Sequence, residues 1–93
     1  MMRSFADRAT EGFFQGRACP KAWRPFAAVA LRKLDMLDAA TALRDLASPP
    51  GNHLEALKGD RKARHSIRIN RQWRVCLRWT EDGPVDVEIV DYH

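Results

Sequence analysis

Residues 65–80 read HSIRINRQWRVCLRWT, and this stretch decides the fold. Apolar and polar side chains alternate from His65 to Asn70 and again from Trp73 to Thr80. This is the period of a β-strand with one buried face. The connection Asn70-Arg71-Gln72 has the length of a hairpin turn. The stretch therefore predicts two antiparallel strands that share an apolar face.

Two further strand candidates flank this hairpin. Leu54 to Lys58 is a short run that ends at Gly59-Asp60. Val85 to Val90 alternates again and follows the turn-length connection Glu81-Asp82-Gly83-Pro84. Because consecutive strands are joined by tight turns, the second half of the chain is predicted to form an antiparallel meander.

The first half of the chain is predicted to be helical. Arg8 to Phe14 follows Asp7, a suitable residue for the positive end of a helix, and ends at Gly16. A short strand at Met2 to Phe5 is an equally good interpretation of the first residues. Segments from Pro25 to Ala40 and from Thr41 to Ala47 have helical apolar spacing.

The Pro25–Ala40 helix has a well-defined apolar face at 3.6-residue spacing. That face consists of Phe26, Ala27, Ala30, Leu31, Leu34 and Leu37. Arg32, Lys33, Asp35 and Asp38 fall elsewhere on the helix. Ser48-Pro49-Pro50-Gly51-Asn52 then marks the change from helix to sheet. The chain is predicted to be one α/β (α+β) domain over residues 1–93, with helices covering the apolar face of the sheet.

Composition restricts the class of protein. No apolar run has the length of a membrane span, and Asp7 and Glu11 interrupt any signal-peptide pattern, so we expect a cytoplasmic protein without a membrane partner. Cys19 and Cys76 lack metal-ligand spacing, and no glycine-rich phosphate loop or nucleophile elbow occurs. We expect reduced thiols and no metal or cofactor. A net charge of +4 and a pI near 9.6 indicate an anionic partner, either nucleic acid or an acidic protein.

Strand alternation assigns the side chains of the sheet to two faces. The covered, apolar face is predicted to hold Ile67, Ile69, Val75, Leu77, Trp79, Val85, Val87 and Ile89. The open face is predicted to hold Ser66, Arg68, Arg74, Cys76, Arg78, Asp86, Glu88 and Tyr92.

The open-face arginines have two interpretations. In the first they pair with Asp86 and Glu88 on a solvated surface, which suits Arg78 in mid-strand. In the second they bind phosphate, because a planar guanidinium forks onto two phosphate oxygens. Arg68 and Arg74 suit this second interpretation, because they flank one turn and can converge without nearby acids.

The strand candidate that begins at Val85 runs into Asp91, Tyr92 and His93, which can all donate or accept a proton. One interpretation is an acid–base site at a strand end; the other is a polar strand end facing water. Strict alternation places Asp91 and His93 on the covered face, so they reach the open face only if the strand twists or has ended. An enzyme of this sequence would use side-chain acid–base chemistry.

Several motifs resemble the HigB-type toxins of the RelE/ParE superfamily. They are LKGDR at residues 57–61, SIRIN at 66–70, WR at 73–74 and DYH at 91–93. Arg3-Ser4-Phe5 and the segment from Leu34 to Ala40 also fit the family, so the resemblance covers nearly the whole chain. It implies two N-terminal helices packed on a curved, mainly antiparallel sheet of about four to five strands.

The resemblance also implies a function and partners. HigB-type toxins belong to type II toxin–antitoxin systems and cleave mRNA in the ribosomal A site, without metal, through the ribose 2′-OH. The expected partners are the ribosome, mRNA and a HigA-type helix-turn-helix antitoxin. Operator DNA is expected to be bound through the toxin–antitoxin complex. A ParE-like toxin, which acts on gyrase without cleaving RNA, and a nucleic-acid-binding regulatory module remain as alternatives.

The resemblance assigns roles to individual residues. It implies catalysis by Asp91, Tyr92 and His93, with His93 suited to be an acid because a neighbouring carboxylate favours imidazolium. Arg74 is expected at the scissile phosphate and counts among the catalytic residues. The expected RNA-binding residues are Lys58, Arg61, Arg68 and Arg74.

One position departs from the family pattern. Several HigB-type toxins carry a histidine three residues before the Lys-Gly pair, and this chain has Glu55 there. Glu55 retains the ability to act as a catalytic base but not as a cation. His53 would share its face in a regular strand and is the alternative replacement.

Overall fold

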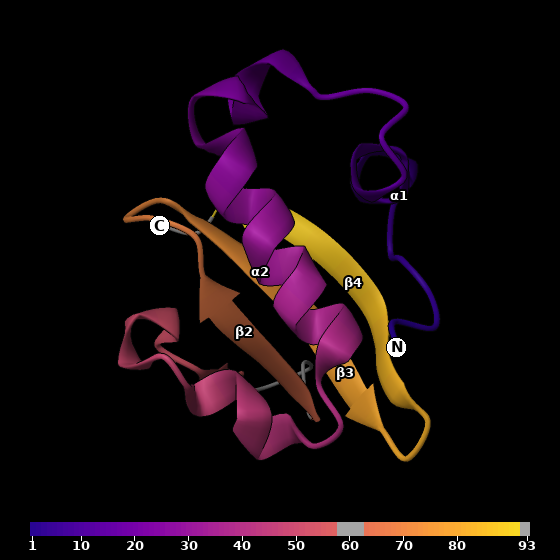
Figure 1. Ribbon diagram of the computed structural model, residues 1–93, viewed down its shortest axis with the longest axis vertical. Coiled ribbons are helices and arrows are strands. Elements are labelled where there is room, and N and C mark those ends of the chain that lie inside the picture. The colour runs from indigo at the N-terminus through magenta and orange to yellow at the C-terminus, as the bar shows by residue number, and fades with distance from the viewer. Residues whose placement is uncertain (58–62, 92–93) are drawn as a thin grey trace.

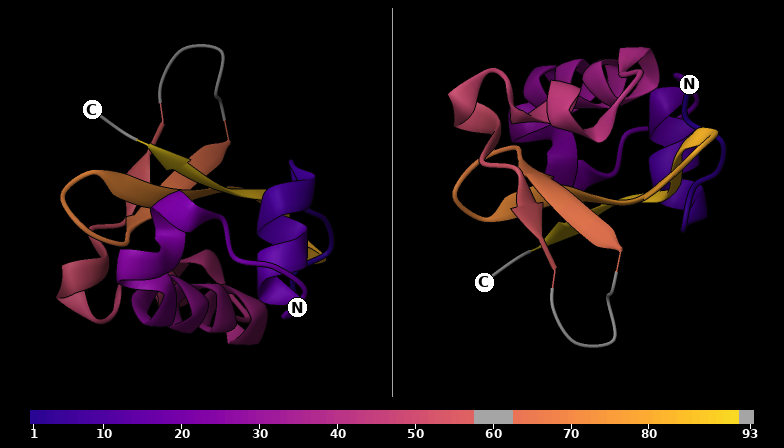
Figure 2. Two further views of the ribbon diagram at one scale, coloured as in Figure 1. Left: turned by 90° about the horizontal axis from the view of Figure 1, so that it is seen from above. Right: turned by 90° about the horizontal axis from the view of Figure 1, so that it is seen from below.

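Two layers make up the fold, a four-stranded sheet and the helices that cover one of its faces (Figures 1 and 2). The computed structural model describes residues 1–57 and 63–91. The strands are β1 (Glu55–Ala56), β2 (Arg64–Arg68), β3 (Trp73–Thr80) and β4 (Gly83–Asp91). They pair antiparallel in the order β1-β2-β3-β4, so the predicted meander is confirmed.

Helical segments occupy the first half of the chain. The α-helices are α1 (Arg8–Phe14) and α2 (Ala27–Ala39), and the 3₁₀ segments are η1 (Lys21–Phe26), η2 (Leu43–Ala47) and η3 (Pro50–Asn52). Figure 1 shows α2 lying across the sheet and α1 beside β4. None of the helices in the described ranges has the length and hydropathy needed to cross a membrane.

The two helical segments predicted after residue 24 begin later than expected. Phe26 has a φ of −123°, outside the helical range, and its ring packs on Trp73 with 5.3 Å between centroids. As a result, α2 starts at Ala27 instead of Pro25. The Asp45 carboxylate accepts from Thr41 N at 3.0 Å and Ala42 N at 3.1 Å. These bonds hold Ala42 extended, so a short 3₁₀ turn from Leu43 replaces the predicted helix from Thr41.

The core lies between α2 and the covered face of the sheet. Ala30, Leu34 and Leu37 are fully buried there, as the helical spacing predicts. Two residues of α2 differ from the prediction: Leu31 is 37% exposed, whereas Lys33 is only 7% exposed. The buried face of α2 therefore includes Lys33 instead of Leu31. The Lys33 side chain contacts Asn52, which follows η2.

The first residues are extended and also precede a helix, so both interpretations of the N-terminal segment are partly correct. Phe5 forms a parallel bridge with Val87 of β4, and Ala6 N donates to Val87 O at 2.9 Å. The helix α1 begins directly afterwards, where the Asp7 carboxylate accepts from Thr10 N at 2.7 Å. This segment covers the outer edge of β4.

A β-bulge in β4 corrects the predicted face of Val85. Between the pairs Cys76–Glu88 and Arg78–Val85, β4 contains one residue more than β3. Asp86 has a φ of +53°, and its backbone N donates to Ser4 Oγ at 2.9 Å. The extra residue interrupts the alternation, so Val85 lies opposite the open-face residue Arg78 and is only half-buried.

Candidate functional site

Arg74 is held by several hydrogen bonds on the open face of the sheet. Its Nε donates to Ser66 Oγ at 2.7 Å, and its Nη2 donates to the Ser66 carbonyl at 3.3 Å and to the His53 carbonyl. Arg74 is only 8% exposed, although alternation predicted an open position. The segment at His53 provides this cover. The guanidinium is therefore fixed by neutral oxygen atoms on two of its edges.

Arg68 lies directly opposite Arg74 in the β2–β3 pair, so the two side chains share a face. We call them the arginine pair. Arg68 makes no ion pair with any residue in the described ranges. This register confirms that Arg68 and Arg74 flank one turn on a shared face, but the expectation that no acid lies nearby is wrong, because Glu55 Oε1 is 3.9 Å from Arg74 Nη1. The pair places two arginines at directly opposite positions of neighbouring strands.

The Asn70 side chain holds the turn between these arginines. Asn70 Oδ1 accepts from the backbone N of Gln72 and of Trp73, both at 2.9 Å. Trp73 O accepts in turn from Ile69 N at 2.9 Å and from Asn70 N at 3.2 Å. Such a side-chain-to-backbone turn is a local device that fixes the hairpin register. It therefore also fixes the separation of Arg68 from Arg74.

Glu55 brings a carboxylate to this site. It lies opposite Ser66 in the β1–β2 pair, and its Oε1 is 3.9 Å from Arg74 Nη1. Its side chain is 54% exposed and faces solvent next to a buried guanidinium. An acid that is open to a substrate and held near a fixed cation is a suitable arrangement for proton transfer at a bound phosphate ester.

Of the remaining predicted site residues, Asp91 lies within the described ranges. Asp91 is paired with Trp73, a residue of the covered side, as strict alternation predicts. Its Oδ2 accepts from Gln72 Nε2 at 3.0 Å, which ties the end of β4 to the turn. The other predicted residues lie outside the described ranges; they are Lys58, Arg61, Tyr92 and His93.

The other half of the open face contains opposite charges in contact. We call this group the charge-paired ladder; it consists of Arg64, Arg78, Asp86 and Glu88. Arg64 lies 3.8 Å from Asp86 and 3.7 Å from Glu88. Arg78 lies 3.4 Å from Asp86. The solvated, cross-paired interpretation is therefore correct for Arg78, whereas Arg74 is buried and pairs with Glu55 of β1 instead of with Asp86 or Glu88.

Sequence reasoning missed the acceptors that hold Arg74. The Ser66 hydroxyl lies diagonally across the β2–β3 ladder from Arg74, so the hairpin register contains a signal for this contact. The His53 carbonyl has no such signal. It reaches Arg74 from a distant segment of the chain, where His53 adopts left-handed dihedrals of 46° and 55°.

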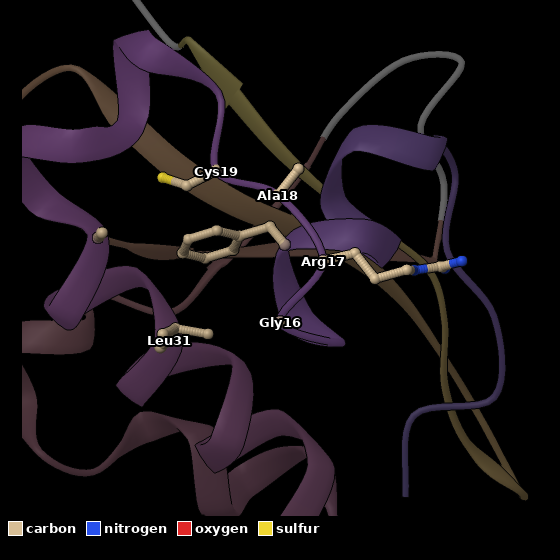
Figure 3. Close-up of a pocket in the computed structure, with 7 residues that line it drawn as sticks. Gly16, Arg17, Ala18, Cys19 and Leu31 are labelled. Carbon is tan, nitrogen blue, oxygen red and sulfur yellow. The ribbon is translucent and has the colours of Figure 1, made fainter.

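A separate groove lies between α1 and α2, away from the arginine pair. It has a volume of about 280 Å³ and is lined by Phe13, Gly16, Arg17, Ala18, Cys19, Ala27 and Leu31. Figure 3 shows Cys19 and Leu31 on opposite sides of the groove, with the Arg17 side chain directed away from it. Because its lining lacks a carboxylate or imidazole, this groove does not offer the acid–base chemistry of the sheet face.

Comparison with known proteins identifies the family. The sequence profile described as "RelE-like toxin of type II toxin-antitoxin system HigB" matches residues 3–93. The chain belongs to this family. Toxin HigB-1 of Vibrio cholerae is 50% identical over 50 residues, which are 54% of this chain and 53% of that protein. An uncharacterized protein of Haemophilus influenzae is 40% identical over 65 residues, which are 70% of this chain and 63% of that protein. The matched segments thus span between half and two-thirds of each relative.

Solved structures support the same fold at low sequence identity. The YoeB-YefM complex from Staphylococcus aureus matches with a TM-score of 0.61 and 17% identity, covering 100% of this chain and 98% of the other. The YoeB/ParE toxin from Agrobacterium tumefaciens matches with a TM-score of 0.51 and 21% identity, covering 99% of both chains. The RelE-like fold of this family, with two α-helices packed on an antiparallel sheet, is therefore confirmed.

Proposed function

We propose that this chain is a ribosome-dependent endoribonuclease that cleaves mRNA and inhibits translation. The observation that supports this proposal is the immobilised Arg74 guanidinium, which lies beside Arg68 and within 3.9 Å of the Glu55 carboxylate. A cation with fixed geometry stabilises the negative charge that develops on phosphate oxygens during displacement. Membership of the toxin family supports the choice of RNA as the substrate.

The proposed reaction is a transfer within the RNA strand. A base removes the proton of the ribose 2′-OH, whose oxygen attacks the adjacent phosphorus and forms a pentavalent phosphorane. The bond to the 5′-oxygen then breaks, and an acid protonates that oxygen as it leaves. The products are a 2′,3′-cyclic phosphate and a free 5′-hydroxyl. No water molecule or metal ion is consumed in this step, so the residues need only position groups and move protons.

The site residues divide these tasks. Arg74 binds the non-bridging phosphate oxygens, and Arg68 holds a neighbouring phosphate. Glu55 is the proposed base, because its carboxylate is exposed and close to Arg74. By family resemblance, Asp91, Tyr92 and His93 complete the acid–base set, with His93 as the acid. Lys58 and Arg61 add to RNA binding, on the same resemblance.

The proposed partners follow from the family. A HigA-type helix-turn-helix antitoxin would neutralise the toxin, and the complex would bind operator DNA. The solved YoeB-YefM structure is a complex, which supports a protein partner for this chain as well. The proposed place of action is the cytoplasm, on translating ribosomes. A ParE-like toxin remains the competing function, because the fold is shared with a protein described as a YoeB/ParE toxin.

Cleavage of mRNA on purified ribosomes tests the proposal. The wild-type protein should produce new 5′ ends at A-site codons, mapped by primer extension. Arg74→Ala should lower the cleavage rate about 100-fold to 1,000-fold, as expected when one positioned donor to the transition state is lost. Arg78→Ala is the matched control, because it removes an arginine of the charge-paired ladder on the same strand. Equal rates for the two variants, or inhibition of gyrase without RNA cleavage, would contradict the proposal.

A further inference from the structure

Helix α2 directs a lysine into the interior of the protein. Lys33 is 7% exposed, and its Nζ donates to Asn52 Oδ1. Burial lowers the pKa of Lys33 below its ordinary value, and the nearby charge of Arg32 lowers it further. Lys33 forms no ion pair with a carboxylate of the described residues. Lysine is rarely buried in this way, because desolvation of its charge is costly. The contact that it makes with Asn52 therefore needs an explanation.

Asn52 joins three parts of the chain. Its side chain is fully buried and accepts from Lys33 of α2. Its Nδ2 donates to Leu46 O of η2 at 3.0 Å and to Ser48 O at 3.3 Å. The amide group thus uses its oxygen toward α2 and its nitrogen toward the η2 segment and also toward Met36 Sδ of α2, at 3.7 Å. This arrangement fixes the last residue of η3 relative to the helical layer.

The residue after Asn52 provides the backbone acceptor of Arg74. His53 has left-handed dihedrals of 46° and 55°, which a residue with a side chain rarely adopts. Its N donates to Pro50 O at 3.1 Å, and its carbonyl accepts from Arg74 Nη2. Such a conformation persists where the surrounding contacts hold it. The contacts of Asn52 are the neighbouring restraint.

We propose that Lys33 and Asn52 are positioning residues that hold the His53 carbonyl where it orients the Arg74 guanidinium. The catalytic consequence rests on the proposed function, in which Arg74 binds the scissile phosphate. The Ser66 hydroxyl fixes the Nε edge of the guanidinium, and the His53 and Ser66 carbonyls both accept from the Nη2 edge. If the His53 carbonyl moves, the Nη2 edge loses one of its acceptors and the guanidinium is held less firmly. Small errors in the position of a catalytic group reduce rates strongly.

The test uses Lys33→Met, Asn52→Leu and the double variant in the full chain. Each single variant leaves a buried polar group without its partner and should lower the melting temperature. The double variant removes the Lys33 donor and its Asn52 acceptor together but still leaves the Leu46 and Ser48 carbonyls without the Asn52 amide, so only part of the stability should return. The Arg74 Nε–H signal in ¹⁵N NMR reports the guanidinium directly. Its hydrogen exchange should be at least about 10-fold faster in all three variants, as expected when one restraint on a hydrogen-bonded group is lost.

Cleavage kinetics give the second readout. In all three variants kcat should fall about 10-fold to 100-fold, while KM for the ribosome complex stays near the wild-type value, because misplacement affects the transition state. Lys33→Gln keeps a donor for Asn52 without the charge and should retain most of the Arg74 protection. Val87→Ala is the control: it weakens the core at the α1 side of β4. It should lower the melting temperature without changing Arg74 exchange.

The outcomes separate the two proposals. Return of both stability and Arg74 protection in the double variant would show that the pair is only structural, and would overturn the positioning role. Unchanged Arg74 exchange in the single variants would overturn it as well, whatever the cleavage rates are. If the wild-type protein does not cleave RNA, the proposed function fails. The NMR signal would still decide whether Lys33 and Asn52 hold Arg74 in place.

Discussion

The arginine pair and the charge-paired ladder lie on the same face of the same sheet and differ in what surrounds their guanidinium groups. In the ladder, Arg64 and Arg78 face the carboxylates of Asp86 and Glu88 at 3.4–3.8 Å. In the pair, Arg74 donates hydrogen bonds to a hydroxyl and two carbonyl groups, and the Glu55 carboxylate also lies 3.9 Å from its Nη1. Neutral acceptors orient a guanidinium without cancelling its charge, whereas carboxylates do both.

The comparison teaches that strand position alone does not determine whether an arginine is buried and oriented, as the proposed phosphate site requires. Arg74 and Arg78 are four residues apart in β3 and have the same pattern of neighbours in sequence. What distinguishes them is the cover: Arg74 is buried under the segment that carries the His53 carbonyl, and Arg78 is open to solvent. A buried, oriented cation loses less entropy when it binds a phosphate and interacts more strongly with it.

Among the variants that test this comparison, Glu55→Gln is expected to have the largest effect. Glu55→Gln removes a carboxylate next to the arginine pair and leaves a side chain of the same size. If Glu55 is the base, the cleavage rate should fall about 100-fold or more, which is typical for loss of general base catalysis. Single-turnover cleavage on ribosomes measures this rate. Glu88→Gln, in the ladder, is the matched control and should cleave like the wild type.

A faster Glu55→Gln variant would give Glu55 a different role. It would show that the carboxylate only restrains Arg74 through their 3.9 Å contact, and that another residue is the base. His53 would then be the next position to test.

A smaller effect is expected for Arg68. Arg68→Ala should weaken binding of single-stranded RNA several-fold and reduce the slope of log affinity against log salt by about 0.7, the value for one phosphate contact on a single strand. Arg64→Ala removes an arginine that carboxylates already neutralise, so its slope should remain close to that of the wild type. Fluorescence anisotropy at several salt concentrations measures both. Identical slopes for the two variants would show that the arginine pair has no special affinity for phosphate.

Local features of the sequence predicted most of the elements. The bounds of α1 at Arg8–Phe14 and of β3 at Trp73–Thr80 agree with the structure, because caps and strand alternation are short-range signals. The convergence of Arg68 and Arg74 was predictable for the same reason, since one short turn fixes their register.

Features that depend on distant contacts were not predictable from local pattern. The bulge at Asp86, which changes the face of Val85, is held by Ser4 at the opposite end of the chain. The burial of Arg74 depends on His53, 21 residues earlier. Lys33 was assigned to the polar side of its helix, because the partner that draws it inward, Asn52, lies beyond η2. Each of these interactions joins two segments that lie far apart in the chain, whereas the periodicity of a sequence describes one segment at a time.

Removing a negative charge from the charge-paired ladder would test the same comparison by making the ladder more like the arginine pair. Asp86→Asn removes the carboxylate that contacts both Arg64 and Arg78. Its cost in the free energy of unfolding should be small, about 0.2–1 kcal/mol for solvent-exposed ion pairs. RNA binding should tighten and its salt slope should become steeper, because two arginines gain net charge. Asp82→Asn changes an exposed acid of the β3–β4 turn by the same charge and is the control. Equal salt slopes in the two variants would show that only total charge matters.

The smallest expected effect concerns how the contribution of Lys33 to the free energy of unfolding depends on pH. Burial lowers the pKa of Lys33 below its ordinary value of 10.5, so the folded protein binds this proton less tightly than the unfolded chain. Between the lowered pKa and 10.5 the unfolded chain therefore binds more protons, and the contribution of Lys33 to the free energy of unfolding rises with pH. Lys33→Met lacks this contribution. Its stability relative to the wild type should therefore decrease steadily as urea denaturation is repeated from pH 7 toward pH 10.

Lys21→Met, which removes an exposed lysine, should show no such trend. A constant difference between Lys33→Met and the wild type would mean that Lys33 keeps its charge in the folded protein at no cost. The helical support of the His53 carbonyl would then be independent of pH.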